Sequence, residues 1–474
     1  MREGISPEDR DLVRTFESAD QGHVFRFWDG LNPRSRQNLM DQVRSIDLGL
    51  VGRLGKACRK DMDVKAEKEL LEPALFIPIP ETPDQIREAR RARSQGEKAI
   101  REGKLAAFLV AGGQGTRLGF DGPKGMFPIG PVSRKSLFQM HAEKILAFGR
   151  AFSVSIPWYI MTSETNDDVT REFFQNNRHF GLDSGNVVFF KQRMIPALDH
   201  SGKLILEQKG RIFMSPNGHG GSLLALKESG AIDDMKSRGI EFISYFQVDN
   251  ALIRIVDPVF VGYHILQKSD MSSKMAQKRD PDEKVGIFGR AGGKLRVIEY
   301  SDLDPVLAQR TAPDGRLVFG AGSIAIHLIS VSFVEELVRG GFKLPYHVAH
   351  KRIPCIDEEG ESVQPEQPNG YKFETFVFDA LQQARHPVIL EIVREEEFSP
   401  VKNSQGEDSP ETAERDITRL FLGWFEQAGI TVPAETAKDP DVKAEISPLF
   451  ALDLEEFRKK IPEHFAMKRQ VYFG

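Results

Sequence analysis

The feature that most constrains the fold is a short, wholly apolar segment followed at once by a run of glycines. Residues 105–110 read LAAFLV and residues 111–119 read AGGQGTRLG. An apolar run of this length suits a strand buried on both faces of a parallel sheet. Glycines directly after it let the backbone turn its N–H groups toward a ligand. The chain therefore predicts a parallel α/β sheet with a ligand-binding loop at the carboxyl end of this strand.

The segments that follow alternate between strand and helix patterns. In chain order they are a helix from residue 136, a strand at 158–161, a helix at 167–175, and strands at 187–190, 241–247 and 323–328. Alternation of this kind predicts a doubly wound, Rossmann-like α/β sheet. Ligands bind such sheets beyond the carboxyl ends of the strands.

The length of the chain predicts more than one structural region. It has 474 residues, which exceeds the size that one hydrophobic core organises. Residues 1–95 read as a helical N-terminal region, because capping sequences begin at Ser6 and at Thr82. We expect the α/β catalytic domain over residues 96–395 and a small C-terminal domain over residues 396–474.

Charge and cysteine content exclude several classes of protein. The chain carries 64 basic and 69 acidic residues, so it lacks the basic excess of a nucleic-acid binder. Cys58 and Cys355 lie far apart, with no metal-ligand spacing and no disulfide framework, which fits a reducing compartment. No apolar stretch resembles a signal peptide or a membrane span. We expect a cytoplasmic protein with neither nucleic acid nor membrane as a partner.

Two common glycine motifs do not fit the loop. The dinucleotide fingerprint requires glycine where Leu118 stands, which argues against a dehydrogenase. The Walker A loop requires Gly-Lys-Ser/Thr, whereas Lys124 follows Pro123 and precedes glycine. The cations at the end of the loop, Arg117 and Lys124, suit a polyphosphate. The alternative is a tight turn without a ligand.

The whole loop, LVAGGQGTRLGFDGPKGMFPIG at residues 109–130, resembles the signature loop of the UDP-sugar pyrophosphorylases (UDPGP type 1), especially those that act on N-acetylglucosamine. The resemblance runs through several separate blocks from about residue 105 to 410. It implies a uridylyltransferase that converts UTP and a sugar 1-phosphate to a UDP-sugar and pyrophosphate. The implied ligands are therefore UTP, a sugar 1-phosphate and Mg²⁺.

By this resemblance the glycine-rich loop holds the uridine and the triphosphate. Arg117 and Lys124 would neutralise the β- and γ-phosphates, and Gln192 would read the uracil edge, for which it has both donors and an acceptor. The implied nucleotide-binding residues are Gly112, Gly113, Gly115, Gln192, Gly218 and His219. Taken alone, Gln192 reads as a loop residue, and the glycines around His219 read as a surface turn.

The resemblance also implies a metal ligand at the end of a strand. Asp249 lies in the segment Gln247-Val248-Asp249-Asn250. One carboxylate together with substrate phosphates can hold Mg²⁺, because this cation prefers oxygen ligands and retains waters. The alternative for Asp249 is a helix cap.

The implied sugar site draws on later segments. Gly286 and Glu299 match positions that contact sugar hydroxyls in the family. Phe376 and Phe378 stand two apart on an expected strand, where they would wall the sugar pocket or pack in the core. Lys402 matches a lysine that bridges the phosphates of substrate and product, and it lies in a loop able to close over the ligand. The implied catalytic residues are therefore Arg117, Lys124 and Lys402.

The identity of the sugar is where the chain departs from the resemblance. The N-acetylglucosamine enzymes usually carry asparagine at the positions of His219 and Ile326. We expect N-acetylglucosamine 1-phosphate as the substrate. The alternatives are a UTP–glucose-1-phosphate uridylyltransferase, a UDP-sugar pyrophosphorylase of broad tolerance, and an inactive sensor that binds nucleotide sugars.

Overall fold

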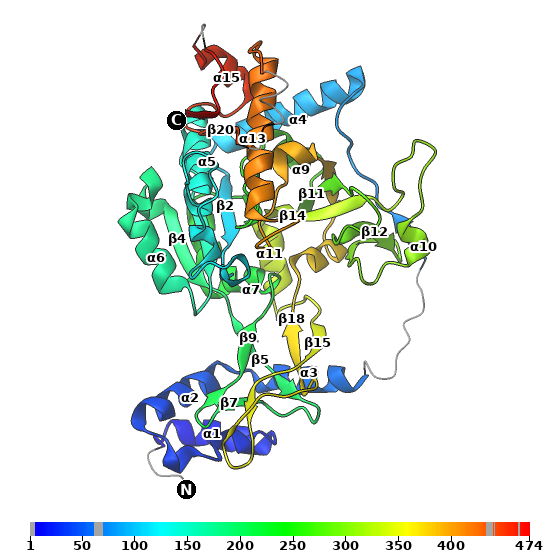
Figure 1. Ribbon diagram of the computed structural model, residues 1–474. Helices are drawn as coiled ribbons and strands as arrows, with labels where there is room; N and C mark the ends of the chain where they lie inside the picture. Colours follow the sequence, from blue (N-terminus) through cyan, green and yellow to red (C-terminus); the bar gives the residue numbers. More distant parts are fainter. Residues whose placement is uncertain (1–4, 61–69, 433–438, 440, 463–464) are drawn as a thin grey trace. The chain divides into compact units, whose positions relative to one another are not determined.

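The computed structural model describes residues 5–60, 70–432, 439, 441–462 and 465–474, and its elements are labelled in Figure 1. The chain divides into two compact units. The first unit comprises Met1–Lys68, Arg193–Ser222 and Leu344–Val377. The second unit comprises Glu69–Gln192, Leu223–Lys343 and Phe378–Gly474.

A mixed ten-stranded sheet forms the centre of the second unit. Its parallel part runs in the order β10 (Phe242–Gln247), β2 (Leu105–Val110), β3 (Trp158–Thr162) and β4 (Val187–Lys191). On its other side, β10 pairs antiparallel with β14 (Ala321–Ser330). The five predicted strands are confirmed, each to within two residues at either end.

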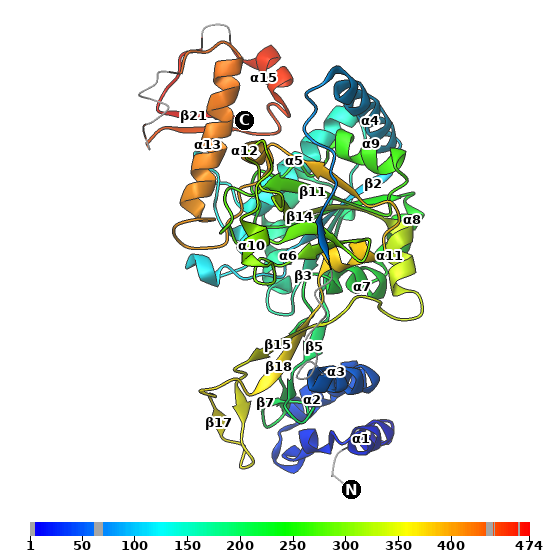
Figure 2. The same cartoon turned by 90° about the vertical axis from the view of Figure 1, so that its right-hand side faces the viewer.

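Helices cover both faces of this sheet, which confirms the predicted Rossmann-like class. In Figure 2, α4 (Pro83–Arg101) and α9 (Pro258–Leu266) lie above the strands, whereas α7 (Gly221–Glu228) and α11 (Val331–Val338) lie below them. The remaining elements of the sheet and its helices are β1 (Leu71–Pro73), β11 (Met271–Gln277), β12 (Ile287–Ala291), β13 (Lys294–Ile298), β19 (Val388–Glu391), α5 (Leu137–Phe152), α6 (Asp167–Asn176), α8 (Ala231–Ser237), α10 (Pro305–Ala308) and α12 (Arg394–Glu397).

The first unit joins helices from the start of the chain to short strands from two later segments. Its helices are α1 (Asp9–Ser18), α2 (Pro33–Ser45) and α3 (Leu48–Lys60), and Phe16 of α1 shares one apolar core with Tyr371 and Phe373. The strands are β15 (His347–Lys351), β18 (Gly370–Glu374) and β6 (Leu198–Asp199) in one sheet, and the pairs β5 (Met194–Pro196) with β9 (Met214–Pro216), β7 (Leu206–Gln208) with β8 (Arg211–Ile212), and β16 (Cys355–Ile356) with β17 (Ser362–Val363).

The two units do not follow the linear ranges 1–95, 96–395 and 396–474. Helix α4 crosses the boundary at residue 95 and packs in the second unit. The segments 193–222 and 344–377 leave the α/β part and complete the first unit, because their apolar side chains cover those of the N-terminal helices.

The C-terminal part of the second unit has an apolar cluster of its own. Helix α13 (Pro410–Gln427) starts at a capping box formed by Ser409 and Thr412. It packs with α15 (Leu454–Lys460) and with the parallel pair β20 (Lys443–Ile446) and β21 (Gln470–Phe473). None of the helices within the described ranges is long and apolar enough to cross a membrane.

Two glycines let α4 and α9 cross at backbone contact. A Cβ atom placed on Gly96 of α4 would lie 1.9 Å from the carbonyl oxygen of Pro258, and one on Gly262 of α9 would lie 1.7 Å from that of Ala92. Both distances are far inside van der Waals contact, and the opposing atoms belong to the backbone. A side chain at either position would therefore push the two helices apart.

We expect Gly262→Ala to lower the free energy of unfolding by about 1–3 kcal/mol through this overpacking. Gly423→Ala is the matched control, because Gly423 lies inside α13 and its added Cβ would meet nothing within 4 Å. The control should stabilise the protein by about 0.5–1 kcal/mol, since alanine costs less conformational entropy in a helix. Denaturant unfolding measures both changes, and an unchanged midpoint for Gly262→Ala would contradict the close crossing.

Candidate functional site

The glycine-rich loop turns back on itself after β2. The N–H of Gly115 donates to the carbonyl of Gly122 (2.8 Å), and the N–H of Lys124 donates to that of Gly113 (3.1 Å). A Cβ on Gly115 would lie 2.8 Å from the Phe120 ring, whereas one on Gly113 would meet nothing within 4 Å. Gly115 therefore serves the packing of the loop, whereas the space beside the α-carbon of Gly113 is open.

Two of the predicted nucleotide-binding residues lie side by side. Gln192 directly follows β4, and its N–H donates to the carbonyl of Thr162 (2.8 Å). A Cβ on Gly112 would lie 2.8 Å from Nε2 of Gln192. The amide thus packs against bare backbone at the carboxyl ends of β2 and β4, where it offers donors and an acceptor to a planar ring.

The two predicted cations of the loop have different surroundings. Arg117 is exposed, and among the described residues it has neither an ion pair nor a hydrogen bond. Lys124 is largely buried, and its Nζ lies 3.6 Å from a carboxylate oxygen of Asp249. The structure therefore brings together the lysine expected to bind phosphate and the carboxylate expected to bind a metal.

Asp249 lies in the turn directly after β10 and caps no helix. The next helix, α9, starts eleven residues after β10 ends, and its cap is Asp257, whose carboxylate accepts from the N–H groups of Val259 and Phe260. The carbonyl of Asp249 accepts from the N–H of Val401 (3.0 Å). The capping alternative for Asp249 is therefore excluded.

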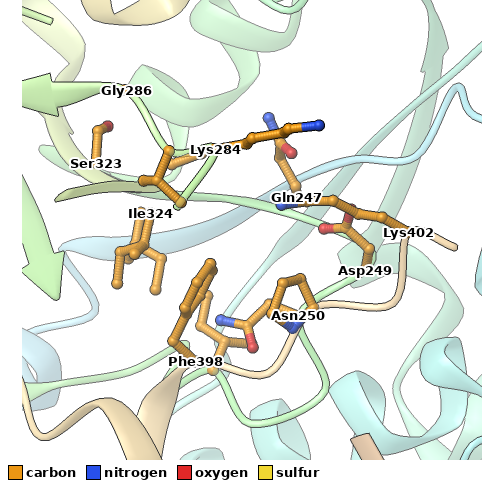
Figure 3. A pocket seen from close by; sticks show the side chains of 14 residues that line it. Gln247, Asp249, Asn250, Lys284, Gly286, Ser323, Ile324, Phe398 and Lys402 are labelled. Carbon is orange, nitrogen blue, oxygen red and sulfur yellow. The ribbon is translucent and has the colours of Figure 1, made fainter. Parts of the chain in front are cut away.

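A pocket in the second unit joins several predicted residues (Figure 3). Asp249 and Lys402 lie on one side of it and Ser323 and Ile324 on the other, while the side chain of Lys284 extends between them. Its lining consists of Gln247, Asp249, Asn250, Ile253, Lys284, Val285, Gly286, Ser323, Ile324, Ala325, Ile326, Phe398, Pro400 and Lys402. Sequence reasoning missed Lys284 and Phe398, although both lie within the segments that carry the resemblance.

A bulge in β14 shapes one wall of this pocket. The pairing of β14 with β11 shifts between Ser273 and Met275, which face His327 and Ser323. Ala325 lies between these two partners with φ 55°, a conformation that L-residues rarely adopt. Residues 324–326 of β14 therefore lie outside the regular pairing with β11. Among them, Ile326 is 2% exposed and lies in the pocket wall.

Lys402 and two of the predicted sugar residues, Gly286 and Glu299, lie in or beside the same pocket. The Nζ of Lys402 lies 3.1 Å from a carboxylate oxygen of Asp408 in its own loop. Gly286 lines the pocket, and a Cβ placed on it would lie 3.5 Å from Oε1 of Glu299. Gly286 and Glu299 are thus neighbours.

The glycines around His219 contact the chain itself. A Cβ on Gly218 would lie 2.5 Å from the carbonyl oxygen of Thr375, and the N–H of Gly220 donates to the same oxygen (2.8 Å). The His219 ring stacks on Phe376, with centroids 5.2 Å apart. The expectation that these glycines press against a ligand must therefore be corrected for Gly218, because the backbone of Thr375 fills that place.

The placement of Phe376 and Phe378 on a strand was wrong. β18 ends at Glu374, and a 3-10 helix, η7 (Val377–Gln382), follows. The geometry of a strand, in which side chains two residues apart point to the same face, therefore does not apply to these two rings. Phe378 is buried, 8% exposed, as in the core-packing alternative, and Phe376 packs between His219 and His347. Neither ring lines the pocket at Asp249.

Asp249 is the one metal ligand that the resemblance implies. Across the described ranges, no group of three or more His, Cys, Asp or Glu side chains is arranged to hold a metal ion. Asp249 does face a cation already, the Lys124 ammonium. A donor set of one carboxylate fits a hard divalent cation that takes its remaining ligands from phosphates and water.

The chain is similar to proteins of known type along most of its length. UDP-N-acetylhexosamine pyrophosphorylase-like protein 1 of Xenopus tropicalis is 37% identical, and the match covers 94% of this chain and 93% of that protein. UDP-N-acetylglucosamine pyrophosphorylase of Saccharomyces cerevisiae is 35% identical, with 89% and 92% covered. The crystal structure of the uridine diphosphate N-acetylglucosamine pyrophosphorylase of Trypanosoma brucei superposes with a TM-score of 0.83 at 29% identity, over 100% of this chain and 99% of that one.

The sequence model of one family covers both the α/β sheet and the C-terminal part. That family is described as UTP–glucose-1-phosphate uridylyltransferase, and its model matches residues 66–464. The match includes the glycine-rich loop, Gln192, Asp249 and Lys402, the residues that the structure places at the carboxyl ends of the strands and in the adjoining pocket. The chain belongs to the UTP–glucose-1-phosphate uridylyltransferase family.

Proposed function

We propose that the protein is a uridylyltransferase that converts UTP and N-acetylglucosamine 1-phosphate to the UDP-sugar and pyrophosphate. One observation supports the proposal most strongly: the Gly112–Gln192 pair, the Lys124–Asp249 pair and the pocket lined by Lys402 all lie in the second unit. The names of the relatives favour N-acetylglucosamine over glucose as the sugar.

The chemistry needs placement and positive charge rather than a strong base. The nucleophile is a phosphate oxygen of the sugar 1-phosphate, which is anionic near neutral pH because its second pKa is about 6. It attacks the α-phosphorus of UTP in line, and the bond to the bridging oxygen of the departing pyrophosphate breaks. Arg117, Lys124 and Lys402 would neutralise the charge that develops on the pyrophosphate.

We also propose that Asp249 holds Mg²⁺ together with the phosphates of the substrate. When bound, the cation would supply positive charge to the phosphate oxygens. Lys124, now 3.6 Å from Asp249, would then direct its ammonium to the β- and γ-phosphates. We place the reaction in the cytoplasm, since the two cysteines, Cys58 and Cys355, lie far apart in the sequence and give no disulfide framework.

An inactive sensor on the same fold would bind the nucleotide sugar without turnover. Incubation of the purified protein with UTP, Mg²⁺ and a panel of sugar 1-phosphates separates the two possibilities. Release of pyrophosphate supports the transferase, and binding of the UDP-sugar without pyrophosphate release supports the sensor.

We expect Arg117→Ala and Lys124→Ala to fold normally and to lose about 3 kcal/mol of transition-state stabilisation, roughly a hundredfold in kcat. Each variant removes a cation that would contact the leaving group. Arg90→Ala is the control, because Arg90 is exposed on α4. Steady-state turnover at saturating UTP measures the effect, and near-normal turnover would remove that residue from the catalytic set.

Chelation of divalent cations with EDTA should abolish turnover. Asp249→Asn should raise the Mg²⁺ concentration needed for half-maximal activity and leave the melting temperature nearly unchanged. Asp257→Asn should lower the melting temperature and leave the Mg²⁺ requirement nearly unchanged, since Asp257 caps α9 and forms a buried ion pair with Lys274. Breaking such a pair costs about 3–5 kcal/mol of stability. Full activity in excess EDTA would refute the metal assignment.

The sugar preference should depend on the pocket wall at Ile326. We expect wild type to favour N-acetylglucosamine 1-phosphate over glucose 1-phosphate in kcat/KM. Ile326→Asn should raise this ratio about tenfold, because a buried polar group of the sugar gains a partner worth about 1–3 kcal/mol. Ile326→Val keeps the wall apolar and should leave the ratio unchanged. A wild-type ratio in favour of glucose 1-phosphate would overturn the choice of sugar but not the uridylyl transfer.

A further inference from the structure

Side chains of helix α5 hold the backbone on both sides of Asp249, while the segment 397–401 bonds to Asp249 and Asn250 themselves. After β10 ends, the carbonyl of Val248 accepts a hydrogen bond from Nε2 of His141 (3.1 Å). The carbonyls of Ala251 and Ile253 both accept from Nζ of Lys144, at 2.6 and 2.9 Å. His141 and Lys144 stand one turn apart on α5. The carbonyls on both sides of Asp249 are therefore tied to that helix.

Lys144 occupies an unfavourable place for a cation. Lys144 is half-buried, and over the described part of the chain no carboxylate lies within ion-pair distance of it. Burial lowers the pKa of Lys144 to about 7, with Glu397 acting to raise it and Arg254 to lower it. By contrast, the buried Lys274 lies 2.6 Å from Asp257 and 2.5 Å from Glu397.

A methionine or leucine would fill the space of Lys144 without the cost of desolvating a charge. What only the lysine supplies is a pair of charge-assisted hydrogen bonds to the two carbonyls. The hydrogen bonds to Ala251 and Ile253 therefore account for a lysine at this position better than packing does.

The same helix also contacts the loop that carries Lys124. A Cβ placed on Gly125 would lie 2.2 Å from the ring of Phe138, in the first turn of α5. One rigid helix thus touches the residue beside Lys124 at its start and holds the backbone around Asp249 two turns later. Helix α5 therefore supports both sides of the Lys124–Asp249 pair, whose charged atoms lie 3.6 Å apart.

We propose that Lys144 is a positioning residue for the reaction: by holding the carbonyls of Ala251 and Ile253 it fixes the Asp249 carboxylate relative to Lys124 and to the metal bound with UTP. The proposal rests on the proposed function of Asp249. It makes Lys144 a determinant of metal affinity and kcat without any contact to uracil or sugar.

The test compares Lys144→Met, Lys144→Gln and Lys144→Arg in the full chain. Mn²⁺ binding in the presence of UTP is measured by water-proton relaxation, and kcat, KM for UTP and the melting temperature are measured alongside. We expect Lys144→Met to lower kcat and Mn²⁺ affinity at least tenfold with KM for UTP within about twofold, since Gly112 and Gln192 are untouched. Lys144→Arg should restore both to within about threefold, and Lys144→Gln should fall between.

The control on the same helix is Arg150→Met, at an exposed position in the last turn of α5, which should change nothing. A folded Lys144→Met protein with wild-type kcat and Mn²⁺ binding overturns the proposal. The proposal is also overturned if Lys144→Arg is as impaired as Lys144→Met, because Lys144 would then act through packing. If the methionine variant fails to fold, the glutamine variant decides by the same criteria.

The variant Asp249→Asn, measured in parallel, separates the role of Lys144 from the role of Asp249. Unchanged metal binding and turnover in this variant would mean that Asp249 itself was misassigned.

Discussion

The site depends on the parallel pairing of β2 with β10. Their last residues, Val110 and Gln247, are direct partners in the sheet, so the glycine-rich loop and the turn with Asp249 leave the sheet next to each other. Parallel strands whose carboxyl ends coincide place their loops on one edge, which is the reason that ligands bind there. A register shift of two residues would keep every side chain on its face but move the turn by about 7 Å along the strand, and Lys124 would lose contact with Asp249.

This dependence explains which parts of the site could be predicted from the sequence. Gly112, Gln192 and Asp249 each follow a strand within two residues, and the strands are evident from their apolar runs. Local pattern and the rule for parallel sheets were therefore sufficient to place them at one edge. Their assignment to UTP and Mg²⁺ came from the resemblance, since spacing alone does not distinguish a ligand loop from a turn.

The remaining features depend on contacts between segments far apart in the chain. Nothing in the residues around Gly218 indicates that Thr375 lies against them, and a lysine in a helix such as Lys144 reads as a solvated position. The bulge at Ala325 has no local signal either, because alanine has no preference for a positive φ. Its conformation is set by the strands on both sides of it. The division into two units was missed for the same reason, since three separate segments build the first unit.

The composition of the first unit has a consequence for biosynthesis. Its core unites Phe16, Trp28 and Leu39 with Leu198 and with Phe373, so the helices made first cannot complete the burial of their apolar faces until the ribosome has added roughly three hundred more residues. At about 5–20 residues per second, this delay lasts on the order of 15–60 seconds. During that time the second unit is itself only partly synthesised. The nascent chain must therefore carry an exposed apolar surface through most of its translation, and molecular chaperones have a defined segment, the first sixty residues, to protect.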